Sequence, residues 1–215
     1  MENKNKGRLE IVCGSMFSGK TEELMRRLNR AEYAKQNVLT IKHQIDKRKS
    51  QTCIATHSGR ERHAFSIDND KNNLYRILEL ANKNIQVVGF DEIQFFPKEI
   101  IDVVIKLVDN GKRVIAAGLD MDFRGEPFGI MPTLMALSDD VTKLKAICVI
   151  CGKDAHHTQR VINGKPAKYD DPIILVGASE CYEARCRNCF KVEKSSPDQI
   201  NPNILQTNKR PQTQI

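Results

Sequence analysis

The chain has 215 residues, of which 40% are hydrophobic and 28% are charged, ordinary values for a globular protein that buries its own core. No apolar run approaches the roughly 20 residues needed to span a bilayer, and the apolar run near the N-terminus is too short for a signal peptide, so we expect a cytoplasmic protein with no membrane partner. The net charge of +7 would suit nucleic acid, but about half of the excess lies at the two chain ends, and we interpret it as solvated surface with no nucleic-acid partner.

A phosphate-binding loop follows the first predicted strand. The apolar run Leu9–Cys13 predicts a buried strand, and the residues from Thr21 onward have apolar positions at helical spacing. Between them lie Gly14, Ser15, Met16, Phe17, Ser18, Gly19, Lys20 and Thr21, which read as a glycine, four residues and then Gly-Lys-Thr. Such a loop turns successive backbone N–H groups toward a phosphate chain at the start of a helix. We expect Lys20 to reach the β- and γ-phosphates and the Thr21 hydroxyl to hold Mg²⁺.

Strands and helices alternate in the next part of the chain. The apolar spacing predicts a strand over 38–41, a helix over 74–81, a strand over 85–90, a helix over 97–108, a strand over 113–118, a short helix over 134–137 and a strand over 144–150. Residues 49–70 are polar and without a clear period, so we expect a mobile loop there. The alternation predicts a mostly parallel α/β sheet. Ligands bind at the carboxyl ends of such strands, which places Asp46 and Arg48 toward the nucleotide, although a plain charged loop is an equal alternative.

Two carboxylates end the strand predicted over residues 85–90. An apolar strand that ends in Asp-Glu, downstream of a phosphate loop, places the first carboxylate beside Mg²⁺ and the second toward the group that attacks the γ-phosphate. We therefore expect Asp91 to remain ionised as a metal partner and Glu92 to accept the proton of the attacking oxygen. If water attacks, the protein is an ATPase, and if a substrate hydroxyl attacks, it is a kinase.

Aromatic residues and glycines lie in the loop predicted over residues 119–129, at the rim where ligands bind. Phe123 and Phe128 can stack on a base from there. They can equally be core residues, and composition alone favours the core.

Two Cys-x-x-Cys pairs predict a structural zinc site. The four cysteines are Cys148, Cys151, Cys186 and Cys189. Four thiolates at this spacing suit a tetrahedral Zn²⁺ with no open position, and the metal would clamp the base of the long loop between the pairs. A disulfide is disfavoured in a cytosolic enzyme, and a redox-active pair would leave the second pair unexplained.

The remaining cysteines and three histidines lack partners at ligand spacing. We expect the cysteines to be plain small residues and the histidines to lie at the surface; they are Cys13, Cys53 and Cys181, and His43, His57 and His63. The tail from Ser195 has few apolar residues and is expected to be disordered. We thus expect a disordered N-terminus (1–8), a phosphate-loop domain (9–146), a zinc and loop domain (147–192) and a disordered tail (193–215).

Four motifs together are more specific than any one of them. They are the loop Gly-Ser-Met-Phe-Ser-Gly-Lys-Thr, Asp91-Glu92-x-Gln94-Phe95-Phe96, Asp120-x-x-Phe123-x-x-x-Pro127-Phe128-Gly129 and the paired cysteines around a long loop. This combination resembles the cytosolic, zinc-containing family of thymidine kinases over roughly residues 8–190. The resemblance implies an α/β fold with a mostly parallel sheet of phosphate-loop NTPase (RecA-like) topology, plus a small zinc-binding domain that carries a lasso loop.

The resemblance also implies an activity and its partners. It implies transfer of the γ-phosphate of ATP, with Mg²⁺, to the 5′-hydroxyl of thymidine, giving dTMP for nucleotide salvage and DNA synthesis. Deoxyuridine is a further expected substrate. Zn²⁺ would be structural, the assembly would be a homotetramer, and dTTP would inhibit as an end product.

The same matching implies roles for individual residues. Glu92, Lys20 and Arg48 would be catalytic, and Thr21, Asp91 and Asp46 would be the Mg²⁺ partners. ATP would be bound by residues 14–21 together with Asp91, Glu92, Ile93 and Gln94. Thymidine would be bound by Met16, Leu119, Phe123, Phe128, Thr158, Ile173, Leu175, Val176, Gly177 and Tyr182.

Two other functions fit parts of the pattern. A nucleic-acid-stimulated ATPase with a zinc ribbon would also use the Asp-Glu strand end and the basic chain ends. A nucleotide-binding scaffold without catalysis is disfavoured by Glu92.

Overall fold

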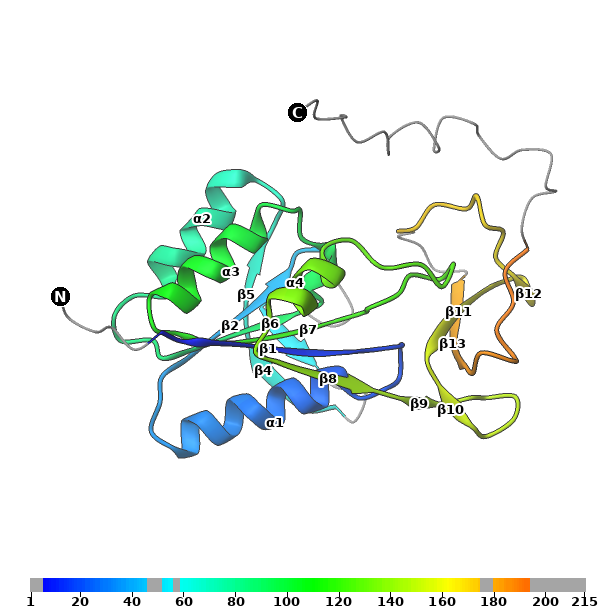
Figure 1. The fold of residues 1–215 in the computed structure, drawn as a ribbon, viewed down its shortest axis with the longest axis horizontal. Coiled ribbons are helices and arrows are strands. Elements are labelled where there is room, and N and C mark those ends of the chain that lie inside the picture. Colours follow the sequence, from blue (N-terminus) through cyan, green and yellow to red (C-terminus); the bar gives the residue numbers. More distant parts are fainter. Residues whose placement is uncertain (1–5, 46–51, 56–58, 175–179, 194–215) are drawn as a thin grey trace, which may run out of the picture.

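The computed structural model describes residues 6–45, 52–55, 59–174 and 180–193 (Figure 1). Its elements in chain order are β1 (Arg8–Gly14), α1 (Lys20–Tyr33), β2 (Val38–His43), β3 (Cys53–Ala55), β4 (Glu61–His63), β5 (Phe65–Ile67), α2 (Lys71–Leu80), β6 (Val87–Asp91), the 3₁₀ helix η1 (Ile93–Phe95), α3 (Ile100–Asp109), β7 (Arg113–Gly118), α4 (Met131–Leu137), β8 (Asp140–Leu144), β9 (Ala146–Ile147), β10 (Asp154–Ala155), β11 (His157–Ile162), β12 (Lys165–Pro166) and β13 (Glu180–Arg185). The chain ends expected to be disordered fall largely outside the described residues. None of the helices in the described ranges has the length and apolar character needed to cross a membrane.

A six-stranded sheet in the order β5-β2-β6-β7-β1-β8 forms the centre of the molecule. Every neighbouring pair in it is parallel, so the carboxyl ends of all six strands lie at one edge. The strand β7 lies between β1 and β6, the two strands that lead into the glycine-rich loop and the Asp-Glu pair. The predicted α/β fold with a parallel sheet is confirmed.

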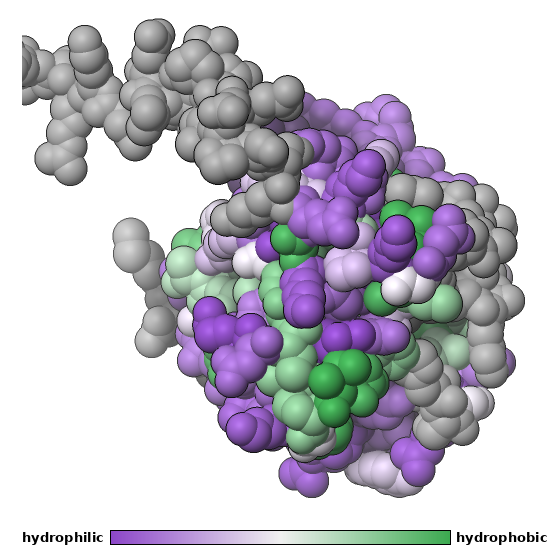
Figure 2. Space-filling model, turned by 90° about the vertical axis from the view of Figure 1, so that its right-hand side faces the viewer, coloured by the Kyte–Doolittle hydropathy of each residue, from purple (hydrophilic) through white to green (hydrophobic). Residues whose placement is uncertain are grey.

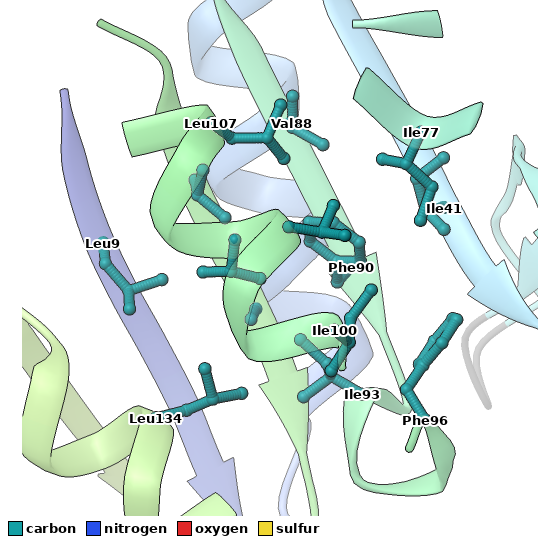
Figure 3. Packing of buried hydrophobic residues seen from close by; sticks show 14 of the residues in the cluster. Leu9, Ile41, Ile77, Val88, Phe90, Ile93, Phe96, Ile100, Leu107 and Leu134 are labelled. Atoms are coloured by element: carbon teal, nitrogen blue, oxygen red, sulfur yellow. The ribbon is translucent and has the colours of Figure 1, made fainter. Parts of the chain in front are cut away.

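Helices cover both faces of this sheet, as all-parallel sheets require. The helix α1 lies on one face, and α2, α3 and α4 lie on the other (Figure 1). Successive side chains of β1 therefore enter different cores: Ile11 packs with the α3 side, whereas Val12 packs with Leu24 and Leu28 of α1. Figure 3 shows the larger core, where Ile100 and Leu107 of α3 lie over β6. These two cores support the edge at which the carboxyl ends meet.

A smaller part of the chain lies beyond that edge. It contains the two-stranded sheet β10-β9 and the three-stranded antiparallel sheet β12-β11-β13. Its buried cluster consists of small residues, namely Ala146, Cys148, Ala155, Ala184 and Cys186. Figure 2 views the molecule from this end, where polar side chains dominate and apolar patches interrupt them. A cluster of alanines and cysteines buries little apolar area, so this part of the chain has a weak core of its own.

Two predictions of local structure were wrong. Residues 49–70 were expected to form a loop, but the described parts contain the β3-β4 hairpin and the edge strand β5. Each of these strands has three residues, too few to produce a recognisable period. The strand expected over 144–150 was placed too late in the chain, since β8 covers Asp140–Leu144 and the expected range contains the two-residue strand β9 (Ala146–Ile147). As an edge strand, β8 has side chains that are partly buried or exposed, so it lacks a continuous apolar run.

Glu10 in β1 is the centre of a buried ion cluster. Its carboxylate is 3% exposed and accepts hydrogen bonds from Arg113 at 2.6 Å and Arg27 at 2.8 Å, and Arg8 lies 3.1 Å away. Burial raises the pKa of this carboxyl, but the hydrogen bond and charge of Arg113, with the charges of Arg8 and Arg27, outweigh it. The pKa of Glu10 therefore lies below its ordinary value.

We expect Glu10→Gln to lower the free energy of unfolding by about 3 kcal/mol at pH 7, because it leaves arginine charges without their buried partner. A carboxyl whose pKa is lowered in the folded state stabilises the protein above the unfolded pKa and loses this contribution as the pH falls. The difference between the variant and the parent should therefore shrink below pH 4.5, the ordinary value. Urea unfolding followed by circular dichroism at several pH values measures it, since the chain has no tryptophan.

The exposed ion pair of Lys6 and Asp109, 3.5 Å apart, offers a matched control. Asp109→Asn should change the free energy of unfolding by less than about 0.5 kcal/mol. An equal effect of both variants would contradict a special role of the Glu10 cluster.

Candidate functional site

The glycine-rich loop joins the end of β1 to the start of α1. Gly14 has a φ of 142°, and a Cβ there would lie 2.4 Å from the carbonyl oxygen of Leu144, so only glycine fits. The helix begins at Lys20, and its N-cap residue is Gly19, which has no side chain that could cap the first N–H groups. The first backbone N–H groups of α1 therefore point toward the loop, where the helix dipole favours an anion. This geometry suits a phosphate chain.

Lys20 and Thr21, the last two residues of the loop, are both buried. The Lys20 ammonium, 8% exposed, donates to the carbonyl oxygen of Ser15 at 2.8 Å. The Thr21 hydroxyl lies 3.3 Å from both carboxylate oxygens of Asp91 at the end of β6. The fold thus brings together two groups that are seventy residues apart in sequence and that can share a cation.

Glu92 lies directly after Asp91 in an unusual backbone conformation. Its φ of 52° and ψ of 43° are left-handed, a conformation that costs a residue other than glycine about 1–2 kcal/mol. Residues in such conformations cluster at functional sites, where the surrounding structure holds them. Glu92 is 8% exposed and therefore buried.

Gln94 connects this carboxylate to the next strand. Its Nε2 donates to Glu92 Oε2 at 2.6 Å, and its Oε1 accepts from the backbone N–H of Leu119 at 3.1 Å. A Cβ at Gly118 would lie 2.5 Å from Gln94 Oε1, so the glycine at the end of β7 permits this approach. Both polar ends of the Gln94 amide are therefore engaged, which orients the Glu92 carboxylate.

The phosphate loop also contacts the smaller part of the chain. The backbone N–H of Met16 donates to Thr158 Oγ1 at 3.0 Å, and the Ser15 hydroxyl lies 3.4 Å from the carbonyl oxygen of Ala155. Thr158 is in β11 and is 3% exposed. The structure therefore brings together Met16 and Thr158, two residues expected at the nucleoside pocket.

Phe123 and Phe128, the aromatic residues of 119–129, are both buried. Phe123 is 3% exposed and lies under the guanidinium of Arg160, 4.0 Å from its ring centroid. Phe128 packs edge-on against Phe95 with a centroid distance of 5.8 Å. Leu119, at the start of this segment, is partly exposed. The three residues share one loop at the carboxyl edge of the sheet.

The same loop holds the segment that precedes Ile173. Arg124 donates to the carbonyl oxygen of Asp171 at 3.0 Å and lies over the Tyr169 ring at 4.9 Å. The Tyr169 hydroxyl donates to Glu126 at 2.5 Å. The segment before Ile173 is thus attached to residues 124–126 through polar contacts, whereas the Ile173 side chain is 39% exposed.

The four predicted zinc ligands form one cluster. The sulfur atoms of Cys148, Cys151, Cys186 and Cys189 all lie within 4.8 Å of one another. Sulfur atoms about 3.8 Å apart are expected around a tetrahedral Zn²⁺ with bonds of about 2.3 Å, and Cys151 Sγ is 3.6 Å from Cys186 Sγ. That distance is too long for a disulfide, and all four cysteines are free. The cluster can hold a zinc ion with no open position.

Some of the expected site residues fall outside the described residues, and others are placed differently from the prediction. Asp46, Arg48, Leu175, Val176 and Gly177 fall outside the described residues. The Ile93 side chain is in the larger core, so any phosphate contact would come from its backbone. His43 is 5% exposed and not at the surface, because it packs edge-on against Phe96; burial lowers its pKa.

Cys13, next to the phosphate loop, was predicted to be a plain small residue without a ligand partner, and the structure agrees with this. Cys13 at the end of β1 is fully buried, and burial, with the charge of Asp120, raises its pKa to about 11. It is therefore a neutral thiol at pH 7.

Sequence patterns missed one residue that the structure places beside several others. Arg160 is 1% exposed and contacts Phe123, Pro172, Ile173 and Tyr182. A single arginine in an otherwise unremarkable strand has no motif that would have revealed it. The sequence offers one weak signal: Arg160 is a charged residue two positions after Thr158, which is expected at the nucleoside pocket.

Comparisons with known proteins agree on one family. A family model described as thymidine kinase matches residues 7–190. A curated protein named thymidine kinase from Coprothermobacter proteolyticus is 56% identical over 180 residues, which cover 84% of this chain and 88% of that protein.

Proposed function

The chain belongs to the thymidine kinase family, and from this premise we propose that it transfers the γ-phosphate of ATP to the 5′-hydroxyl of thymidine, and of deoxyuridine, giving ADP and the nucleoside monophosphate. The observation that carries this proposal is the position of Glu92. An oriented carboxylate next to the Asp91–Thr21 pair stands beside the phosphate loop, where an acceptor hydroxyl would meet the γ-phosphate. The family match gives no support to the nucleic-acid-stimulated ATPase.

The phosphate side of the reaction is assigned to the loop and the strand ends. The N–H groups of residues 14–21 and the Lys20 ammonium would hold the triphosphate, with Arg48 as a further cation and with Asp91, Glu92, Ile93 and Gln94 along its edge. Mg²⁺ bound with ATP would neutralise developing phosphate charge, and Thr21, Asp91 and Asp46 would hold it. The Thr21–Asp91 contact at 3.3 Å supports the first two of these assignments.

Glu92 would act as general base toward the 5′-hydroxyl. Phosphoryl transfer needs little covalent chemistry from the protein beyond alignment, charge neutralisation and removal of one proton. The hydrogen bond from Gln94 fixes one carboxylate oxygen and therefore the direction of the carboxylate. The proton of the hydroxyl would move to Glu92 as the oxygen attacks the γ-phosphorus and the bond to the ADP oxygen breaks.

The nucleoside would lie between the phosphate loop and the smaller part of the chain. Its proposed contacts are Met16, Leu119, Phe123, Phe128, Thr158, Ile173, Leu175, Val176, Gly177 and Tyr182. The Met16–Thr158 hydrogen bond and the shared loop of Leu119, Phe123 and Phe128 support a common pocket. An apolar wall suits the thymine methyl group, and polar groups placed for the thymine edge would discriminate against cytosine.

The remaining proposals concern organisation. The cysteine cluster would hold a structural Zn²⁺ that clamps the lasso of a zinc domain over residues 147–192, next to a phosphate-loop domain over 9–146. Reduced thiols suit the cytoplasm. We propose a homotetramer, end-product inhibition by dTTP and a role in nucleotide salvage for DNA synthesis, as the family resemblance implies.

A single assay tests the activity. The purified protein is mixed with ATP, Mg²⁺ and each natural deoxynucleoside in turn, and phosphorylated products are separated. Thymidine and deoxyuridine should acquire phosphate, whereas deoxycytidine and the purine deoxynucleosides should not. ATP hydrolysis stimulated by DNA, without any nucleoside monophosphate, would contradict the proposal.

A further inference from the structure

We infer that Arg160 is a positioning residue that assembles the nucleoside pocket, and this inference rests on the proposed thymidine kinase activity. Arg160 touches no reacting atom in this scheme. It joins three of the residues proposed to bind the nucleoside, and they come from three separate segments of the chain. The consequence is a specific effect on nucleoside binding rather than on phosphate transfer.

The contacts of the guanidinium define this role. Its Nε donates to the Tyr182 hydroxyl at 3.1 Å, and its two terminal nitrogens donate to the carbonyl oxygens of Pro172 and Ile173 at 2.5 Å each. Its flat face lies over the Phe123 ring at 4.0 Å, within the range of a cation–π contact. One planar group thus fixes a side chain of β13, the backbone of residues 172–173 and an aromatic ring of the 119–129 loop.

Burial makes these contacts energetically important. Arg160 is 1% exposed, and a guanidinium removed from water needs its N–H groups paired. The carbonyl oxygens of Pro172 and Ile173 accept two of these donors at fixed separation and so set the position of that backbone relative to β11. A lysine has the charge but no planar fork, and it cannot donate to both carbonyls and the phenol while stacking on the ring.

The strand that carries Arg160 also reaches the phosphate loop. Thr158 and Arg160 are two residues apart on β11 and therefore point to the same face of its sheet. Thr158 accepts from the Met16 backbone, whereas Arg160 holds Phe123, Ile173 and Tyr182. One face of β11 therefore carries both the contact of Thr158 with the phosphate loop and the contacts of Arg160 with the proposed nucleoside pocket.

The decisive variant is Arg160→Lys in the zinc-loaded, full-length protein. We expect the KM for thymidine to rise at least about tenfold, the equivalent of one lost charged hydrogen bond, while kcat and the KM for ATP change little. Zinc content, measured by atomic absorption, should stay at one ion per chain. Arg187→Lys is the matched control, since Arg187 is an exposed arginine of the same part of the chain, and its thymidine KM should not change.

Other outcomes overturn the inference. An unchanged thymidine KM in a folded Arg160→Lys protein would make Arg160 a purely structural residue, as would a parallel loss of thymidine and ATP affinity. If that variant does not fold, Tyr182→Phe removes only the hydroxyl that accepts from Arg160, and an unchanged thymidine KM there also contradicts the inference. A parent protein that does not phosphorylate thymidine at all refutes the proposed function instead, so the two failures are distinguishable.

Discussion

Glu92→Gln is expected to lower the rate of thymidine phosphorylation by at least about 100-fold, the usual scale for a lost general base, while ATP binding stays nearly intact. The amide has nearly the shape of the carboxylate but cannot accept the proton of the 5′-hydroxyl. Glu92 is one of the proposed contacts along the edge of the triphosphate, but it lies outside the glycine-rich loop, so the loop N–H groups and Lys20 that hold the phosphates are unchanged. Single-turnover measurements with saturating ATP and thymidine separate the chemical step from binding.

Glu99→Gln is a suitable control for this experiment. Glu99 is a partly exposed carboxylate just before α3, and it makes no side-chain cap hydrogen bond to that helix. Glu99→Gln removes one negative charge, as Glu92→Gln does, but it leaves Asp91 and Glu92 at the end of β6 unchanged. The rate of thymidine phosphorylation should therefore not change. If Glu92→Gln leaves the rate near that of the parent, Glu92 is not the general base.

Removal of zinc is expected to weaken nucleoside binding before the central sheet unfolds. The buried cluster around the four sulfur atoms consists of alanines and cysteines, which cannot stabilise this part of the chain without a metal. The central sheet has two larger apolar cores of its own. If the metal-free segment is correctly ordered about one tenth of the time, the KM for thymidine rises about tenfold.

Chelation and Cys186→Ser test this expectation in two ways. Both should raise the thymidine KM at temperatures where far-ultraviolet circular dichroism still reports a folded sheet. Cys181→Ser is the control, because Cys181 is an exposed cysteine of the neighbouring strand β13 outside the cluster, and this variant should retain zinc. Loss of thymidine binding and unfolding of the sheet in one transition would contradict two separately stabilised parts.

Local sequence patterns were sufficient to predict those features that depend on residues close together in the sequence. The glycine-rich loop between an apolar strand and a helical period was predictable because its function is carried by consecutive backbone groups. The cysteine pairs were predictable for a similar reason, since four thiols at short spacing have few alternatives to a shared metal. The three-residue strands β3, β4 and β5 were not predictable, because no period can be recognised in so few residues.

The sequence by itself determined the parallel α/β class, the phosphate loop, the acidic end of β6, the four clustered thiols and the family resemblance. Only the tertiary structure decided which distant groups meet: Thr21 with Asp91, Gln94 with Leu119, and Arg160 with Phe123, Ile173 and Tyr182. The physical reason is that such contacts depend on strand order and on how two small sheets stand at the edge of the central one. Because Arg160 is buried, its guanidinium must pair with the groups around it and so holds them in place. Neither strand order nor burial can be derived from the spacing of residues along the chain.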